Sequence, residues 1–247
     1  MRYFLKLHYK GTKYHGWQKQ PNAITVQAVL DDALSKFFRQ EVLSVGSGRT
    51  DTGVHAKTQV VHIDIAQGFD TDRALYSLNG ILPYDIVIDE IYAVKEGVHA
   101  RFAPISRAYQ YFLSYQADAF SHGLFYHYKK PLDFDKMNEV AKVLFEYIDF
   151  ESFSKVHTDV HTFNCKITEA YWREENGVYV FYIKADRFLR GMVRTIVGTL
   201  LEVGKGNLDI EGFKKIILQK SRKAAGSAVP AQGLFLWEVN YPKDVRI

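Results

Sequence analysis

The stretch VLSVGSGRTDTGVHAKTQVVHIDI, residues 42–65, is the part of this chain that decides how its fold is interpreted. It contains two strand-like segments, 42–46 and 59–65, separated by a polar run in which Arg49 and Asp51 lie between glycines. Hairpin connections normally have about two to five residues, and this one is about twice as long. Because long ordered loops on rigid scaffolds tend to carry chemistry, Asp51 is the first candidate for a functional residue.

Regular elements around this stretch follow the order β-α-β-β-α-β. Alternating apolar residues predict strands, and apolar residues at helical spacing after a capping residue such as Thr25 predict helices. The elements predicted for the first half are strand 2–9, helix 26–38, strands 42–46 and 59–65, helix 72–79 with Thr71 as cap and Gly80 as end, and strand 86–94.

The second half repeats this order with one additional helix. Its predicted elements are strand 107–115, helix 134–148 capped by Asp133, strands 166–173 and 178–185 joined at Asn176-Gly177, an apolar helix 188–203, an extra helix 210–219 and strand 234–239. We therefore predict a pseudo-symmetric α+β fold of two ferredoxin-like (RRM-like) halves, 1–105 and 106–247, with a mostly antiparallel sheet. We expect a cleft at the junction of the halves, which is a common place for a site.

The composition limits the class of protein. The chain has 247 residues and a formal net charge of +4, which is compatible with a polyanionic partner but does not demand one. The single cysteine, Cys165, excludes an intramolecular disulfide and favours a reducing compartment. No apolar run reaches the roughly 18 residues of a membrane span, and the N-terminus lacks the apolar core of a signal peptide, so we expect a cytoplasmic protein without membrane contact.

Six further blocks of sequence accompany the run GRTDTGVHA at 48–56. They are YHGWQKQ at 14–20, HARF at 99–102 with RAYQY at 107–111, FLRGMVR at 188–194, and AG at 225–226 with PAQGL at 230–234. With these blocks the chain resembles the tRNA pseudouridine synthase A (TruA) family over nearly its whole length. The resemblance implies two ferredoxin-like halves, a homodimer, no cofactor and no metal. It also implies tRNA as the partner, with uridines at positions 38, 39 and 40 of the anticodon stem-loop as substrates.

The resemblance also implies roles for individual residues. Asp51 corresponds to the catalytic nucleophile, a carboxylate that can attack the sugar or the base and leave again. Arg194 corresponds to the arginine that pairs with this carboxylate and keeps it charged. Tyr109 corresponds to the tyrosine that stacks on the flipped-out base. Further substrate contacts are expected from residues in the same motifs: Arg49, which would steady the vacated position in the RNA, Leu234 at the floor of the site, and Arg101, Arg187 and Arg190.

The spacing of Arg187, Arg190 and Arg194 at i, i+3 and i+7 predicts that they share one helix face. Arg194 would then point inward, and the other two would point toward phosphates. A second basic cluster, Lys220, Arg222 and Lys223, follows the extra helix, so salt-sensitive RNA affinity is expected. Lys10, Asp186-Arg187 and His161-Thr162 depart from the family pattern, which leaves the RNA contacts there open.

Several alternatives remain at this point. Attack by Asp51 on C1′ of the ribose or on C6 of the ring is open. A non-catalytic RNA-binding protein of doubled RRM-like fold is the first alternative function, and a nucleoside or glycoside hydrolase, which would want a second carboxylate, is the other. His157, Asp159, His161 and Cys165 fall within nine residues and form a rival metal set, but their neighbours favour an extended chain and no second cysteine is present.

Overall fold

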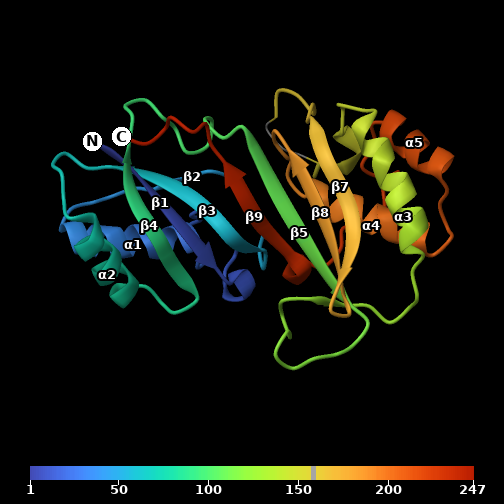
Figure 1. Cartoon of the computed structure of the whole chain (residues 1–247), viewed down its shortest axis with the longest axis horizontal. Coiled ribbons are helices and arrows are strands. Elements are labelled where there is room, and N and C mark those ends of the chain that lie inside the picture. Colours follow the sequence, from blue (N-terminus) through green and yellow to red (C-terminus); the bar gives the residue numbers. More distant parts are fainter. Residues whose placement is uncertain (157–159) are drawn as a thin grey trace. The chain divides into compact units, whose positions relative to one another are not determined.

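The computed structural model describes residues 1–156 and 160–247, and its chain divides into two compact units (Figure 1). The first unit contains Met1–Ser106 together with Phe235–Ile247, and the second contains Arg107–Leu234. Helices and mostly antiparallel strands occur in both units, so the predicted α+β class is confirmed. The assignment of each half to the ferredoxin-like class stays a prediction.

The sheet of the first unit is built around β1 (Arg2–Tyr9), which pairs antiparallel with β3 (His55–Asp64) and β4 (Ile86–Val94). The short β2 (Val45–Gly46) pairs antiparallel with β3. The last strand, β9 (Leu234–Asn240), runs parallel to the beginning of β3, with Phe235 opposite His55. Because of this pairing, residues 235–247 group with the first unit, although the sequence analysis placed them in the second half.

Two helices cover this sheet, and their starts follow from capping residues. Helix α1 (Val26–Phe38) begins after Thr25, whose side chain accepts a hydrogen bond from the amide of Ala28, as predicted. Helix α2 (Thr71–Ile81) begins one residue earlier than predicted, because Asp70 and not Thr71 caps it. Gly80 lies inside this helix and does not end it. A 3-10 turn, Gly11–Lys13, follows β1.

The second unit contains four strands and three α-helices among the described residues. Strand β8 (Val178–Ala185) pairs antiparallel with β5 (Ser106–Ser114) and with β7 (Ile167–Glu175), and the short β6 (Tyr126–His127) runs parallel to β5. The remaining elements are α3 (Phe134–Ala141), α4 (Met192–Gly204), α5 (Ile210–Leu218) and the 3-10 turns Lys142–Phe145, Glu151–Phe153 and Ala231–Gly233.

One predicted helix begins later than the sequence pattern indicates. The apolar pattern suggested a helix over 188–203, but α4 begins at Met192. Gly191 has φ +72°, a left-handed conformation that separates the preceding residues from the helix. Arg187 and Arg190 therefore lie before the helix, and the prediction that they share a helix face with Arg194 is wrong.

The helices of the described ranges 1–156 and 160–247 also bear on the membrane prediction. None of them combines the length and the apolar character that a bilayer span requires.

Candidate active site

Asp51 begins a tight turn in the loop between β2 and β3. The amide of Val54 donates a 3.1 Å hydrogen bond to the carbonyl of Asp51, which closes the turn 51–54. Gly53 has φ +78°, the conformation that a type II turn requires at its third position. The loop is shorter than the sequence pattern suggested, because β3 already begins at His55. The carboxylate of Asp51 is thus carried by a defined turn and is half-buried.

The backbone of segment 14–17 holds this turn in place. The amide of Trp17 donates to the carbonyl of Thr50 at 3.1 Å, and the amide of Gly53 donates to the carbonyl of Tyr14 at 3.3 Å. The hydroxyl groups of Tyr9 and Thr50 share a 2.8 Å hydrogen bond in a buried position. These bonds come from both sides of Asp51, so the orientation of the turn is set by β1 and by the YHGWQKQ motif.

Glycine is required where segment 11–16 approaches the loop. A Cβ atom on Gly16 would lie 2.5 Å from the carbonyl oxygen of Thr50, and one on Gly11 would lie 1.9 Å from that of Val54. The amide of Gly11 also donates to Nδ1 of the buried His55, at 3.0 Å. The ring of His55 stacks on Phe235 with centroids 4.5 Å apart. The backbone of the loop therefore packs directly against the backbone of segment 11–16 at Gly11 and Gly16, with no side chain between them.

Arg49 is exposed, and its Nε donates a 3.0 Å hydrogen bond to Oε1 of Gln18. On the other side of the loop, the side chain of Gln59 donates to the carbonyl of Gly48 at 3.0 Å and accepts from the hydroxyl of Ser47. Arg49 and Asp51 are thus presented by one loop that is fixed at both ends.

In the second unit, Arg194 lies in the first turn of α4 and is tied to the segment that precedes β9. Its Nε donates to the carbonyl of Val229 at 2.7 Å, and the amide of Val229 donates back to the carbonyl of Arg194 at 3.2 Å. The same segment crosses α4 closely, since a Cβ atom on Gly198 would lie 1.8 Å from the carbonyl of Ser227. These contacts fix the plane of the Arg194 guanidinium.

Tyr109 lies on β5, opposite Ile183 of β8, and is 9% exposed. The ring of Phe188 meets it edge to face, with centroids 5.1 Å apart and planes at 90°. Phe188 belongs to the FLRGMVR motif, so this contact joins two of the sequence blocks. Leu234, the first residue of β9, is 5% exposed and follows the Ala231–Gly233 turn.

The remaining predicted contacts are spread over both units. Arg101, in the first unit, lies over the ring of Phe102 at 5.6 Å from its centroid. Arg187, in the second, is half-buried, and its amide donates to the Asp186 carboxylate at 2.7 Å. Arg190 is exposed, and its carbonyl accepts from the amide of Lys155 at 2.8 Å.

The structure groups the predicted residues by unit. Arg49, Asp51 and Arg101 belong to the first unit, whereas the second unit contains the rest: Tyr109, Arg187, Arg190, Arg194 and Leu234. Four residues that hold them were not among the predicted site residues: Tyr9, Trp17, Gln18 and Val229. The sequence signal for three of these residues was their place in or beside a motif: Trp17 and Gln18 lie in YHGWQKQ, and Val229 precedes PAQGL. The motifs did not reveal which atoms would form hydrogen bonds.

The rival metal set lies only in part within residues 1–156 and 160–247. His157 and Asp159 lie outside the described residues. Burial raises the pKa of the Cys165 thiol to about 12, so this side chain is a neutral thiol at pH 7. Among residues 1–156 and 160–247, no three His, Cys, Asp or Glu side chains form a group that could hold a metal ion.

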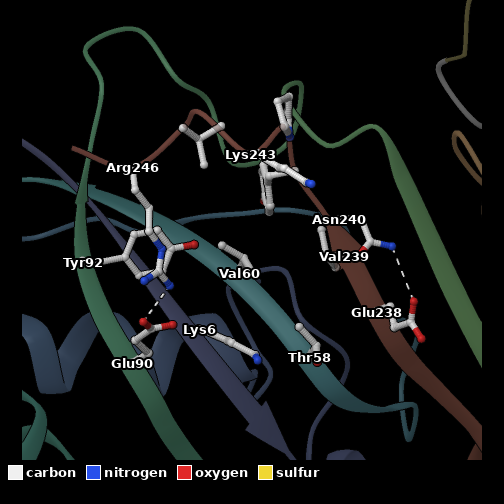
Figure 2. A pocket seen from close by; sticks show the side chains of 13 residues that line it. Lys6, Thr58, Val60, Glu90, Tyr92, Glu238, Val239, Asn240, Lys243 and Arg246 are labelled. Atoms are coloured by element: carbon white, nitrogen blue, oxygen red, sulfur yellow. Dashed lines mark hydrogen bonds and ion pairs between the residues drawn. The ribbon is translucent and has the colours of Figure 1, made fainter.

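A separate hollow of about 390 Å³ lies in the first unit, where the C-terminal segment 241–247 meets the sheet (Figure 2). Arg246 lies 3.8 Å from the ring centroid of Tyr92 and forms a 2.6 Å ion pair with Glu90, as Figure 2 shows. Lys6 of β1 also lines it. None of the predicted catalytic or binding residues lines this hollow, so it is distinct from the Asp51 loop.

Comparison with known proteins agrees with the motifs. Residues 7–103 and 147–242 match the tRNA pseudouridine synthase family profile. The tRNA pseudouridine synthase A of Porphyromonas gingivalis is 51% identical over 248 residues, covering 99% of this chain and 98% of the relative. That of Parabacteroides distasonis is 49% identical over 245 residues (99% and 97%), and that of Bacillus pumilus is 39% identical over 240 residues (94% and 96%).

The matched segments include parts of both compact units and define the protein as an isomerase that modifies RNA. The chain belongs to the tRNA pseudouridine synthase family, and the resemblance inferred from its motifs is confirmed. Asp51, Arg194 and Leu234 lie within the matched segments, whereas Tyr109 lies between them.

Proposed function

We propose that the protein converts uridine to pseudouridine in the anticodon stem-loop of tRNA, at one or more of positions 38, 39 and 40, with Asp51 as the nucleophile. The observation that carries this proposal is the Asp51 turn itself. A carboxylate begins a turn that is bonded to the backbone of Tyr14 and Trp17 and lies in the most specific motif of the chain. Such a pre-positioned group needs no reorganisation before it attacks.

The reaction is an isomerisation in which all atoms of the uracil stay on the nucleotide except one proton. The bond from ribose C1′ to uracil N1 breaks, a bond from C1′ to C5 forms, and the proton on C5 is replaced by one on N1. Asp51 would form a transient bond to C1′ or to C6 and leave again. Both points of attack remain compatible with a carboxylate in this turn.

The other residues would prepare the nucleotide and the carboxylate. Arg194 would pair with Asp51, since a guanidinium held at Nε by Val229 has its plane already set. Tyr109, supported by the edge of Phe188, would stack on the extruded base. Arg49, Arg101, Arg187 and Arg190 would contact the RNA, and Leu234 would pack at the floor of the site. A homodimer without cofactor, located in the cytoplasm, completes the proposal, and sedimentation of the free protein tests the dimer.

The function is tested by tritium release from tRNA labelled at uracil C5. We expect release by the wild-type protein and by Asp118→Asn, and none by Asp51→Asn, which should still bind tRNA. Asp118 is a matched control because it is also a turn aspartate, with its carboxylate accepting from the amides of Phe120 and Ser121. Full release by Asp51→Asn would exclude it as the nucleophile. Binding of tRNA without release by the wild type would favour a non-catalytic RNA-binding protein.

A further inference from the structure

Two hydrogen bonds connect Arg49 through Gln18 to Gln27 of helix α1, and a third joins Gln27 to Ser44. Nε of Arg49 donates to Oε1 of Gln18 at 3.0 Å, and Nε2 of Gln18 donates to Oε1 of Gln27 at 2.9 Å. Nε2 of Gln27 then donates to the carbonyl of Ser44 at 2.8 Å. We call Gln18 and Gln27 together with Arg49 the amide relay.

The direction of the relay is set by its two ends. The carbonyl of Ser44 can only accept, and the guanidinium of Arg49 can only donate. Gln27 must therefore turn its nitrogen toward Ser44 and its oxygen toward Gln18, and Gln18 must turn its oxygen toward Arg49. The amide of Lys19 also donates to Oε1 of Gln27, at 3.0 Å, which requires the same orientation. Flipping either amide would break at least two bonds.

The relay begins on a rigid part of the first unit. Gln27 and Asp31 are four residues apart, so they lie on the same face of α1. Both hold Ser44, because its amide and its hydroxyl donate to Oδ1 of Asp31 at 2.9 and 2.6 Å. Asp31 and Ser44 are buried, so water does not compete for these bonds. Helix α1 thus determines the position of the Arg49 guanidinium.

The relay leaves the outer end of Arg49 available. Its bond to Gln18 uses Nε, and within residues 1–156 and 160–247 its two terminal amino groups have no partner. These two groups form the fork that binds phosphate or a base edge with two parallel hydrogen bonds. Arg49 lies two residues before Asp51 in the same loop. An arginine held in this way presents its fork in one orientation before the RNA arrives.

We propose that Gln18 and Gln27 are positioning residues for tRNA recognition, acting through Arg49. This inference rests on the proposed function, because it assigns Arg49 to the RNA. It predicts that Gln27, which bonds to Gln18 and Ser44 and reaches Arg49 only through Gln18, affects the capture of tRNA. This effect should depend on the presence of Arg49.

The test is a double-mutant cycle on tritium release, with kcat and KM measured for tRNA. Gln27→Met keeps the length of the side chain but cannot form the hydrogen bonds. We expect it to raise KM by about fivefold to tenfold, the effect of one hydrogen bond, with a smaller effect on kcat. In the Arg49→Met background the same substitution should leave KM unchanged. Gln18→Met should behave in the same way.

The control is Asn79→Ala, which removes another amide of the first unit that bonds to backbone. Asn79 accepts from the amide of Ile88 at 2.8 Å and donates to its carbonyl at 2.9 Å, with no connection to Arg49. It should lower Tm while leaving KM near the wild-type value. An equal rise of KM in both Arg49 backgrounds, or no rise in either, would overturn the positioning role while the proposed function stands. Absence of release by the wild type would overturn both.

Discussion

Replacing Gly16 by alanine tests whether the Asp51 turn depends on the close approach of segment 14–17. Gly16 has φ +87°, and an added Cβ would lie 2.5 Å from the carbonyl oxygen of Thr50. The next nearest atoms are the carbonyl carbon of Asp51 at 3.2 Å and the amide nitrogen of Thr52 at 3.3 Å. The methyl group would therefore press on the backbone that carries the proposed nucleophile.

Gly16→Ala should lose stability for two reasons, the strained backbone conformation and the close contact. A second glycine, Gly177, allows the two costs to be measured separately. The left-handed conformation costs an alanine about 1–2 kcal/mol. Gly177, at φ +79° in the β7–β8 hairpin, would bear the same cost, but its added Cβ would meet no atom within 4 Å. The contact at Gly16 must open by about 1 Å to reach an ordinary van der Waals distance, which adds about 1–3 kcal/mol. A displacement of about 1 Å in a reacting group can slow a reaction by about 10²-fold.

The assay compares urea unfolding and single-turnover tritium release for both variants. We expect Gly177→Ala to lose about 1–2 kcal/mol of unfolding free energy and to keep its rate. Gly16→Ala should lose about 2–5 kcal/mol and react about 10- to 100-fold more slowly. Equal losses of stability in the two variants, with a wild-type rate for Gly16→Ala, would refute the argument that this contact positions Asp51.

Four further predictions concern other parts of the molecule. Burial, and then the charges of Arg2 and His99, lower the pKa of His62 from 6.5 to about 4, so as the pH falls the unfolded chain is protonated first. The full pKa shift corresponds to about 3 kcal/mol of unfolding free energy, which solvent screening reduces to about 1–2 kcal/mol. Urea unfolding of the wild type should show this loss of stability as the pH falls from 6.5 to about 4. A similar loss for His62→Asn would exclude His62 as its source. Trp172 has a buried Nε1 without a hydrogen-bond partner in the described ranges. Because phenylalanine lacks this unpaired group, Trp172→Phe should change the unfolding free energy by no more than about 1 kcal/mol. A loss above about 3 kcal/mol would contradict this. Tyr109→Ala should slow tritium release far more than Tyr109→Phe if stacking is its main task, whereas equal losses would assign the role to the hydroxyl. Arg194→Met should fold normally by circular dichroism and lose most of its turnover, and a near-wild-type rate would move the pairing role to Arg49.

Local patterns predicted most elements well. Strands β1, β4 and β8 have the bounds that alternation indicated, because the period of two in apolar residues reflects one buried face of a sheet. The hairpin at Asn176-Gly177 is also confirmed, with φ +52° and +79°. These features depend on neighbouring residues alone, so a single sequence contains the information for them.

Elements that depend on distant contacts were predicted less well. The start of α4 was placed too early, because residues 188–191 continue its apolar pattern. In the structure, Gly191 adopts a left-handed conformation, and the carbonyl of Arg190 accepts a hydrogen bond from Lys155, far away in the sequence. Competition between a helix and such a contact cannot be decided from local propensity.

For the candidate site, the sequence alone was enough to propose which side chains carry the chemistry, because the motif around Asp51 and Arg49 is contiguous, and these roles stay predictions. Only the tertiary structure decided what holds them: the backbone of Trp17 on Thr50, the carbonyl of Val229 on Arg194, and the two glutamines between Arg49 and α1. The physical reason is that a hydrogen bond between residues far apart in the chain forms only where packing brings donor and acceptor within about 3 Å, and packing depends on the whole core.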